Sequence, residues 1–471
     1  MAHTYMIWGP PGTGKTHTLV EYAGKCAAKR ETTCFLSYTK AAAGEAVSRL
    51  KEAGHAINGS TIHSLAFQAL NMTRDQVISF TRKQEFANAT GISFRTGSIE
   101  DAEPQEGDDY SSVLSYANNR MIEPLEAYDI QGRPGQLKRF EMFVKAWNDW
   151  KKTYGYMDFD DMLISCLDTA VDLPTYANIL LDEAQDCSPL QWAVIRKLSA
   201  TAKRVYVAGD DDQAIYEWNG ADPHGMKKFA DDTDAKNRVL DVSIRVPRTA
   251  HKLAHDMALA YIDKRVEKLF RPADRDGSVE QYGGIYNYDF RTMAKSGGLI
   301  LVRDRFRSLE IQKILNADAI PYKINGGQSP WQGFRAEALR GISTFLQGTA
   351  PNPEQKEAMR KMATSEAFVA FMENNKAWFK GKRPSRLLKP MPHGAADFYD
   401  MVDVDKPINL ILSTVHQAKG HEHHNTMIDL TLSAKSLEQM SANPSAEARI
   451  LYVALTRTSD KMALCGSNPL L

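Results

Sequence analysis

A glycine-rich run near the start of the chain limits the possible folds more than any other feature. It matches the pattern G-x-x-x-x-G-K-[ST] at every position and comprises Gly9, Pro10, Pro11, Gly12, Thr13, Gly14, Lys15 and Thr16. The apolar segment Tyr5–Trp8 precedes it, and apolar residues recur at helical spacing from Leu19 to Ala27. Glycines let backbone N–H groups surround phosphate oxygens, and the next helix directs its positive end toward them. The run therefore predicts a phosphate-binding loop between a strand and a helix.

Two adjacent carboxylates follow an apolar strand later in the chain. Asp182 and Glu183 come directly after Ile179-Leu-Leu. Beside a phosphate loop, Asp182 is predicted to hold Mg²⁺ together with the Thr16 hydroxyl, and Glu183 to polarise the water that attacks the γ-phosphate. Lys15 would place its charge at the β- and γ-phosphates. Alone, the carboxylate pair would indicate a solvated strand end, but together the two motifs predict a nucleoside triphosphatase.

Strand-like and helical segments alternate in two parts of the chain, which predicts an α/β protein with two parallel-sheet cores. The first part has expected strands at Thr33–Tyr38, Asn178–Leu181 and Arg204–Ala208 and a helix at Lys40–Leu50. The second part has expected strands at Gly298–Val302 and Ile408–Leu412 and a helix at Ser308–Ala317. Residues 72–156 and 331–405 are mainly helical by pattern, so each core is expected to carry a helical insert.

The two inserts contain aromatic and charged runs of their own. Leu137, Phe140, Val144, Trp147 and Lys151 share one face of a helix, with Phe143 and Trp150 alongside, and these aromatic residues are expected to be core. Gly97–Ser112 contains six acidic residues and no Lys or Arg, which predicts a solvated acidic loop. The basic run Lys380–Lys389 is compatible with binding of duplex phosphates and equally with a solvated linker.

Composition excludes few classes of protein. The 471 residues include 58 Lys+Arg and 58 Asp+Glu, and this zero net charge disfavours a protein that merely coats nucleic acid. The five cysteines form no CxxC pair, so a zinc knuckle and a disulfide framework are not expected. This use of cysteine predicts a protein of the reducing cytoplasm. The chain opens without a signal-peptide pattern, and no run approaches the roughly 18 apolar residues that a membrane span needs.

Further motifs resemble, in order, those of the UvrD/Rep-type superfamily 1 (SF1A) DNA helicases. Asp182–Asp186 resembles the second motif of that family, Gly209–Gly220 its GDDDQSIYRWRG segment and Leu451–Arg457 its LYVALTR segment. Other segments that resemble family motifs are Ser37–Glu45, Thr61–Ser64, Met157–Leu163, Ser243–Pro247, Ala319–Gly327 and Ser413–Glu422. With the phosphate loop, the matches extend from residue 9 to residue 457, which is nearly the whole chain.

The resemblance implies four subdomains, with ATP bound between two RecA-like P-loop cores. Core 1A is expected at 1–71 and 157–235, insert 1B at 72–156, core 2A at 236–330 and 406–471, and a reduced insert 2B at 331–405. By matching positions, Gln213 would sense the γ-phosphate, and Arg245 and Arg457 would act as arginine fingers from the second core. The nucleotide site would also include His17, directly after the loop, and Glu422, near the sugar.

The resemblance also implies a groove for single-stranded DNA across both cores. The residues expected to contact DNA are Tyr38, Thr39, His63, Tyr216, Trp218, Thr414 and His416. Aromatic faces hold any base by stacking, and Tyr216 and Trp218 stand close in sequence to Gln213. That proximity predicts that the nucleotide state alters the grip on a base. The alternative for Trp218 is a residue of the hydrophobic core.

Departures from the family pattern fall on adenine recognition. Eight residues precede Gly9, so the upstream glutamine segment of the family is not expected here. His17 stands where the family commonly has Arg, and Ile244 stands where it has an adenine-stacking Tyr. We therefore expect relaxed base selectivity, with GTP or CTP supporting activity. Insert 2B is also expected to be short, and because the sequence ends 14 residues after Arg457, a C-terminal extension is not expected.

The sequence thus predicts an ATP- and Mg²⁺-dependent 3′→5′ helicase or translocase on single-stranded DNA, with the polarity implied by the resemblance alone. Two alternatives stay open: a translocase that displaces proteins with little unwinding, and a nucleotide-dependent DNA-binding scaffold. Expected partners are single-stranded DNA, junctions of single-stranded and duplex DNA, and repair or replication proteins. A cytoplasmic monomer without membrane contact is expected, from a bacterium or a phage-infected cell. RNA is an alternative substrate, because stacking does not distinguish the sugars.

Overall fold

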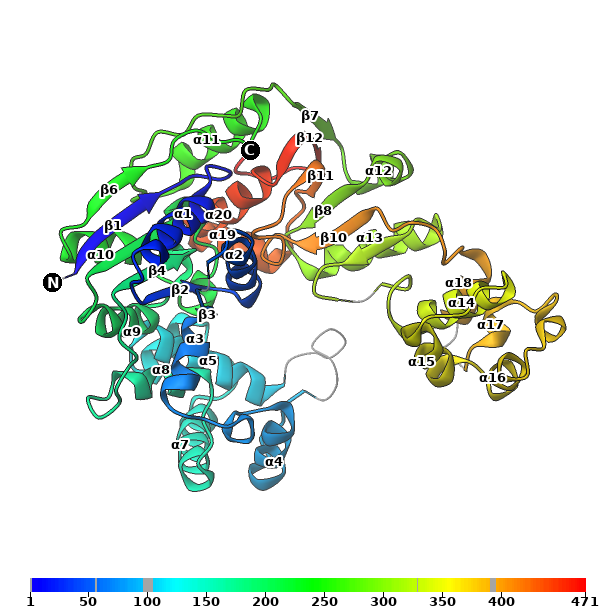
Figure 1. Ribbon diagram of the computed structural model, residues 1–471, viewed down its shortest axis with the longest axis horizontal. Helices are drawn as coiled ribbons and strands as arrows, with labels where there is room; N and C mark the ends of the chain where they lie inside the picture. Colours follow the sequence, from blue (N-terminus) through cyan, green and yellow to red (C-terminus); the bar gives the residue numbers. More distant parts are fainter. Residues whose placement is uncertain (1, 56, 96–104, 328, 390–394) are drawn as a thin grey trace. The chain divides into compact units, whose positions relative to one another are not determined.

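The computed structural model describes residues 2–55, 57–95, 105–327, 329–389 and 395–471, and Figure 1 labels most of its helices and strands. The chain forms two compact units. Unit 1 comprises Met1–Arg245, Ala258–Asp274 and Pro444–Tyr452, and unit 2 comprises Val246–Met257, Arg275–Asn443 and Val453–Leu471. Two of the five passages from one unit to the other lie within helices α11 (Arg248–Tyr261) and α20 (Pro444–Leu455).

A six-stranded sheet forms the centre of unit 1, with strand order β3-β2-β4-β5-β1-β6 and parallel pairing throughout. Its strands are β1 His3–Trp8, β2 Thr33–Ser37, β3 Gly59–Thr61, β4 Asn178–Asp182, β5 Arg204–Gly209 and β6 Lys236–Val239. The associated helices are α1 Lys15–Ala28, α2 Lys40–Glu52, α3 Ile62–Ala69, α8 Phe159–Leu167, α9 Pro189–Ser199 and α10 Gly225–Asp232. Met6 and Leu181 belong to one apolar cluster and Ile7 and Leu180 to another, as alternating side chains do when both faces of a sheet are buried.

The described residues between 72 and 156 are mainly helical. They form α4 Phe80–Thr90, α5 Glu106–Arg120, α6 Pro124–Ile130 and α7 Leu137–Tyr154, after the short 3₁₀ turn Arg74–Gln76. Phe140, Phe143 and Trp147 are buried in a shared apolar cluster, which confirms that these aromatic residues are core. The prediction of an acidic loop at 97–112 is wrong from residue 106 on, where α5 begins, and residues 97–104 lie outside the described part. Glu106, Asp108 and Asp109 lie in the first turn of α5, where acidic side chains favour a helix.

Unit 2 contains a second six-stranded parallel sheet, with strand order β7-β12-β11-β8-β10-β9. Its strands are β7 Ser278–Tyr282, β8 Gly298–Val302, β9 Tyr322–Ile324, β10 Leu410–Thr414, β11 His423–Asp429 and β12 Thr458–Cys465. The associated helices are α12 Phe290–Ser296, α13 Arg305–Ala317 and α19 Ala434–Ala442. The central strand β8 is completely buried, as expected for a strand inside a parallel sheet.

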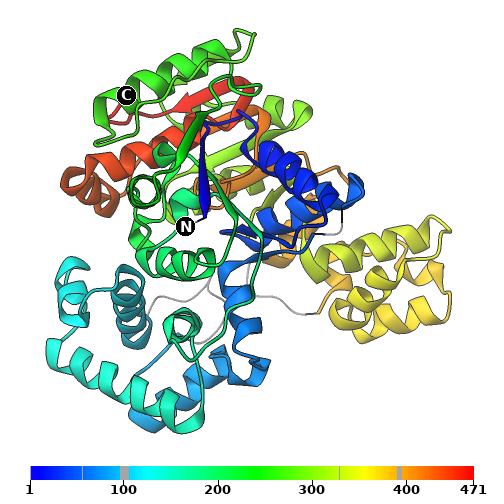
Figure 2. The same cartoon turned by 60° about the vertical axis from the view of Figure 1, so that its left-hand side comes forward.

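A group of helices between β9 and β10 has an apolar core of its own. These helices are α14 Gly333–Leu346, α15 Pro353–Met362, α16 Ser365–Met372, α17 Pro384–Leu387 and α18 Ala395–Met401 (Figure 2, yellow). Leu339, Ile342, Phe345, Met359 and Phe379 form the centre of their shared cluster. The basic side chains of the run 380–389 lie on the surface of this group.

The observed architecture confirms the predicted fold class: two α/β cores with parallel sheets, each accompanied by a mainly helical segment. Within the described ranges, no helix combines the length and the apolar character needed to cross a membrane.

Candidate nucleotide and DNA site

The ends of three neighbouring strands bring the predicted catalytic motifs of unit 1 together. β4, β5 and β1 are adjacent and parallel, so their carboxyl ends meet at one edge of the sheet. The phosphate loop follows β1, Asp182 ends β4, and the run Asp210–Gln213 follows β5. Ligands of open α/β sheets bind at this edge. The fold therefore assembles residues from positions 9 to 213 into one site.

The phosphate loop has the backbone conformation that its glycines allow. Gly12 and Gly14 have φ of +74° and +84°, in the left-handed region that favours glycine. Gly14 caps α1, whose first residue is Lys15. The Lys15 ammonium donates to the Gly9 carbonyl over 2.6 Å, and burial lowers the pKa of this amine. The loop thus combines the N-terminus of α1 with a buried lysine, the two features that favour phosphate binding.

Thr16 and Asp182 form a donor pair that suits a divalent cation. The Thr16 hydroxyl donates to Asp182 Oδ2 over 2.6 Å. Burial, followed by the negative charge of Glu183, raises the pKa of Asp182 to about 6. Burial and the neighbouring negative charge disfavour the ionised form of Asp182, and a nearby cation would stabilise it. Hydroxyl and carboxylate oxygens are ligands that Mg²⁺ prefers. The residues present therefore fit Mg²⁺.

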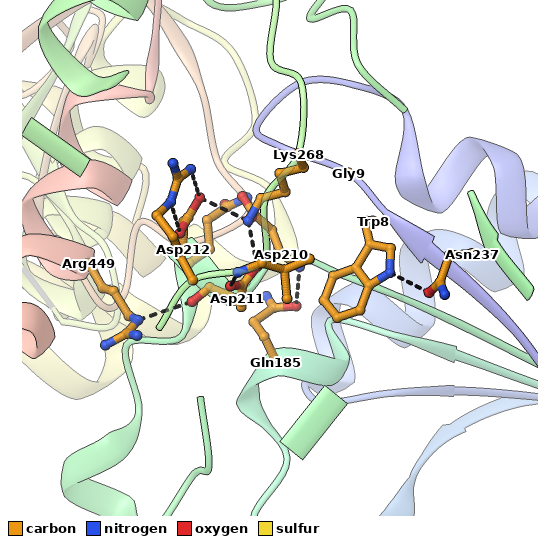
Figure 3. A network of polar contacts seen from close by, with 12 residues as sticks. Trp8, Gly9, Gln185, Asp210, Asp211, Asp212, Asn237, Lys268 and Arg449 are labelled. Atoms are coloured by element: carbon orange, nitrogen blue, oxygen red, sulfur yellow. Dashed lines mark hydrogen bonds and ion pairs between the residues drawn. The ribbon is translucent and has the colours of Figure 1, made fainter. Parts of the chain in front are cut away.

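Glu183 and Gln213 are joined by a chain of hydrogen bonds. Glu183 has φ +53°, an unusual conformation for a side-chain-bearing residue, and such strain gathers at functional sites. Gln185 donates to Glu183 Oε2 over 2.5 Å and accepts from the Asp210 N–H over 3.0 Å. Gln213 Nε2 donates to Asp210 Oδ2 over 2.7 Å. Glu183, the predicted catalytic base, and Gln213, the predicted γ-phosphate sensor, thus belong to one polar network. Part of this network is drawn in Figure 3.

Residues 243–245 pack against the phosphate loop within unit 1. Ser243 Oγ donates to the Pro11 carbonyl and the Ile244 N–H to the Gly12 carbonyl, both over 2.9 Å. A Cβ atom on Gly12 would lie 2.6 Å from the Cβ of Arg245, so glycine is required there by close approach as well as by φ. Arg245 also lies close enough to Lys15 to contribute to the lowering of its pKa. Neither backbone contact was evident from the sequence.

The two side chains at the positions predicted for adenine recognition are exposed. The His17 side chain is 70% exposed and pairs with Glu21, with Nε2 and Oε1 3.2 Å apart. Ile244 is 78% exposed although its backbone is hydrogen-bonded. Neither side chain is held in place by burial, so neither presents a rigid surface on which an adenine would stack.

Three of the residues of unit 1 that are predicted to contact DNA form an aromatic row, which comprises Tyr38, Tyr216 and Trp218. The Tyr38 and Tyr216 ring centres are 5.1 Å apart, and those of Tyr216 and Trp218 6.5 Å. Trp218 is 59% exposed, so its alternative interpretation as a core residue is wrong. Thr39 instead caps α2, its hydroxyl accepting from the Ala42 N–H over 3.1 Å.

A cavity of about 410 Å³ adjoins this row. Tyr38, His63 and Phe159 line it together with Asp160 and Asn219. The His63 ring meets the 59% exposed Phe159 ring edge-on, with centres 5.6 Å apart. Burial lowers the pKa of His63 to about 4, so the imidazole is neutral near pH 7. The sequence did not indicate an exposed Phe159, because an apolar residue at the start of a helix usually packs inward.

The remaining predicted residues belong to unit 2. Thr414 ends β10, and His416 lies in the turn that follows, while Glu422 is exposed just before β11. Arg457 is 1% exposed, and its guanidinium donates to the carbonyls of Val453 and His421 over 2.9 and 3.5 Å.

Three cations with no recognised motif also belong to the unit 1 site. Lys268, Arg265 and Arg449 contact the acidic run Asp210–Asp212 (Figure 3). Their sequence surroundings resemble ordinary surface charge, so no local signal could have identified them.

Comparison with known proteins identifies the relatives of this chain. Residues 1–234 match the family described as "UvrD/REP helicase N-terminal domain". The chain is 26% identical over 253 residues to "DNA helicase II" of Haemophilus influenzae, covering 49% of this chain and 34% of the relative. It is 26% identical over 263 residues to "DNA helicase II" of Escherichia coli, covering 50% and 35%. It is 22% identical over 429 residues to "ATP-dependent DNA helicase Rep" of Buchnera aphidicola, covering 83% and 62%. The matched part is thus about a third of the first two relatives and less than two thirds of the third.

Proposed function

This chain belongs to the UvrD/Rep family of helicases, and we propose that it hydrolyses ATP to move 3′→5′ along single-stranded DNA and to separate duplex strands. The observation that carries the proposal is the polar chain from Glu183 through Gln185 and Asp210 to Gln213. It joins the predicted chemistry of hydrolysis to a segment that continues directly into Tyr216 and Trp218. A nucleotide-dependent change at Gln213 would therefore be felt at the aromatic row.

The proposed hydrolysis depends on positioned charges. Lys15 and the N-terminus of α1 would hold the phosphates, and Glu183 would take the proton of the attacking water. Thr16 and Asp182 would hold Mg²⁺, which supplies charge neutralisation at the β- and γ-phosphates when bound. Gln213 would sense the γ-phosphate. Arg245 and Arg457 would stabilise the negative charge that develops in the transition state, and Glu422 would bind the sugar.

We infer that the functional subdivision follows the predicted subdomains 1A, 1B, 2A and 2B. Its support is that β1–β5 lie in the ranges proposed for 1A and β7–β12 in those proposed for 2A, and that the described residues of 72–156 and 331–405 are mainly helical. The boundary at residue 236 is wrong, because β6 (Lys236–Val239) pairs with β1 in the sheet of unit 1, and Arg245 also belongs to unit 1. The DNA groove would be lined by the aromatic row, His63 and Thr39, and by Thr414 and His416. The cavity beside Tyr38 and His63 has room for a base, which favours a nucleic-acid strand as the ligand.

The first experiment is steady-state ATP hydrolysis with and without single-stranded DNA. We expect strong stimulation by DNA, and a loss of about 10²–10⁴-fold in the Glu183→Gln variant. Glu21→Gln, which removes an exposed carboxylate on α1, is the matched control. A rate that DNA does not change would contradict the motor and favour the nucleotide-dependent scaffold.

A second assay distinguishes a helicase from a translocase that displaces proteins with little unwinding. Tailed duplexes with a 3′ or a 5′ single strand test unwinding and its polarity, and a protein bound to single-stranded DNA tests displacement. Unwinding of the 3′-tailed substrate is expected. Displacement without strand separation would instead favour a translocase with little helicase activity.

A further inference from the structure

Three consecutive carboxylates are buried at the end of β5. Asp210, Asp211 and Asp212 are 0%, 4% and 0% exposed. Their carboxylate oxygens lie within 4.8 Å of one another, a spacing that would suit a metal ion. A lysine ammonium occupies this position instead. Lys268 Nζ lies 3.0, 2.5 and 2.9 Å from carboxylate oxygens of the three residues in turn (Figure 3).

The segment around Lys268 provides further contacts to the same run. Arg265 binds Asp212 through two nitrogens, over 3.0 and 2.5 Å. The Val266 N–H donates to Asp211 Oδ2 over 2.6 Å. Burial alone would lower the pKa of Lys268, but the three carboxylates raise it well above its usual value, so the ammonium stays charged. Removal of such a cation would leave like charges buried side by side, which is costly.

Asp210 connects this ionic cluster to the proposed γ-phosphate sensor. One of its oxygens accepts from Gln213 Nε2 over 2.7 Å, and the other faces Lys268 Nζ at 3.0 Å. An ionised Asp210 can only accept hydrogen bonds, so it turns the N–H groups of the Gln213 amide toward itself. Asp210 thus links Lys268 to the Gln213 side chain.

Arg449 connects the same run to the aromatic row. Its side chain is 3% exposed, and Nε donates to the Asp211 carbonyl over 3.1 Å. Its Nη1 donates to Glu217 Oε1 over 3.1 Å and to Ser445 Oγ over 3.0 Å. Glu217 stands between Tyr216 and Trp218 in the chain. One guanidinium thus holds both the turn that carries Gln213 and the residue between the two aromatic rings.

We propose that Lys268 and Arg449 are positioning residues that make the segment Asp210–Trp218 move as one body, so that occupation of the nucleotide site changes the grip of the aromatic row on DNA. This inference rests on the proposed function and assigns the coupling to two residues outside the recognised motifs. Lys268 acts on the sensor end of the segment through Asp210. Arg449 acts on the DNA end through Glu217.

The test is the coupling between the two sites in Arg449→Lys and Lys268→Met. The affinity for a fluorescent oligo(dT) is measured with and without a non-hydrolysable ATP analogue, and hydrolysis is measured with and without the same DNA. We expect each variant to lose at least about fivefold in the ratio of the two DNA affinities, since allosteric coupling is typically 5–150-fold. The DNA stimulation of hydrolysis, relative to the DNA-free rate of the same variant, should fall in parallel.

Matched controls remove ion pairs that lie elsewhere in unit 1. Arg196→Lys alters an exposed pair with Asp232, and Lys227→Met an exposed pair with Asp231. Both controls should keep the wild-type coupling ratio. Arg449→Lys could weaken the binding of DNA and of nucleotide yet leave unchanged the ratio of the DNA affinities with and without the nucleotide. In that case the role of Arg449 is only structural and the inference is overturned.

The wild-type protein distinguishes failure of the inference from failure of the proposed function. A wild type without DNA-stimulated hydrolysis would overturn both. A wild type with stimulation, together with Arg449→Lys that retains full coupling, would overturn the inference alone. Circular dichroism establishes whether Lys268→Met folds. If it does not, Arg449→Lys decides, because it keeps the positive charge but cannot make the two contacts of the guanidinium to Asp211 and Glu217 at once.

Discussion

The phosphate end and the base end of the proposed nucleotide site are built differently, although both belong to unit 1. At the phosphate end, Lys15 is 9% exposed and Asp182 is 1% exposed, and hydrogen bonds hold both side chains. At the base end, the His17 side chain is 70% exposed and Ile244 is 78% exposed. One end has its charged side chains held in place, and the other presents side chains that are largely exposed.

This difference indicates which part of a nucleotide the site can recognise. Preorganised charges act strongly on phosphates because the protein has already met the cost of orienting and desolvating them. Exposed side chains must give up conformational freedom to bind a base, so they contribute little selectivity. The triphosphate, which all nucleotides share, should therefore dominate binding. Four variants or conditions test this contrast.

The largest effect is expected from Lys15→Met. Loss of the buried Lys15 ammonium, which we propose binds the phosphates, should reduce hydrolysis by at least about 10²–10³-fold. Steady-state kinetics measures the loss, and Lys25→Met, at an exposed position of the same helix, is the control. A variant that keeps a tenth of the wild-type rate would show that the phosphate end is less preorganised than its burial indicates.

Gly12→Ala tests the close approach of residues 243–245 to the loop. The added Cβ meets an unfavourable φ of +74° and a contact of 2.6 Å with the Arg245 Cβ. Gly155→Ala has a similar φ of +68° and no neighbour within 4 Å, so it reports the backbone cost alone. That cost is about 1–2 kcal/mol. Only Gly12→Ala should also lower hydrolysis, by about 10-fold or more; equal rates in the two variants would contradict the importance of the contact.

The raised pKa of Asp182 predicts a pH-dependent demand for Mg²⁺. Its pKa of about 6 lies above the ordinary value for aspartate, so the carboxyl takes up a proton as the pH falls through about 6. Protons then compete with Mg²⁺ for the same oxygens. Between pH 7.5 and pH 5.5, the Mg²⁺ concentration for half-maximal hydrolysis should rise by about three- to tenfold. If the Mg²⁺ concentration for half-maximal hydrolysis is the same at both pH values, Asp182 is not a ligand of the metal.

The smallest effect is expected at the base end. ATP, GTP and CTP should be hydrolysed with kcat/KM values within about tenfold of one another, because one stacking contact is worth about 0.5–1.5 kcal/mol. Ile244→Tyr should raise the preference for ATP over CTP by about three- to tenfold by adding such a contact. Val242→Tyr, at a 44% exposed position nearby, is the control. Strict specificity of the wild type for ATP would refute relaxed base selectivity.

Much of the fold follows from local patterns. The strand at Gly298–Val302 has the predicted bounds, and the helix after the phosphate loop lies where its apolar spacing places it. The strand predicted at Ile408–Leu412 begins and ends two residues later, at Leu410–Thr414. Its ends are set by pairing of Leu410 with Gly298 and of Thr414 with Val302, across more than a hundred residues of chain. Local hydrophobicity cannot specify such a register.

The acidic run beginning at Glu106 shows the opposite kind of error. Its composition resembles a solvated loop, yet a helix begins at Glu106. Negative charge is favourable in the first turn of a helix, so the same residues suit either structure until the next turns are packed. Tyr110 and Val113, farther along the helix, are buried in the apolar cluster of this segment and decide the outcome.

The sequence by itself determined the phosphate loop, the adjacent carboxylates and the alternation that produces two parallel sheets, because each depends on a few neighbouring residues and their backbone preferences. Only the tertiary structure decided what surrounds the acidic run after β5. Lys268 lies 57 positions from Asp211 in the chain and Arg449 lies 238 positions away. Such contacts arise when folding brings distant segments to the end of one strand, and the energy of a buried ion pair depends on that geometry rather than on any local pattern.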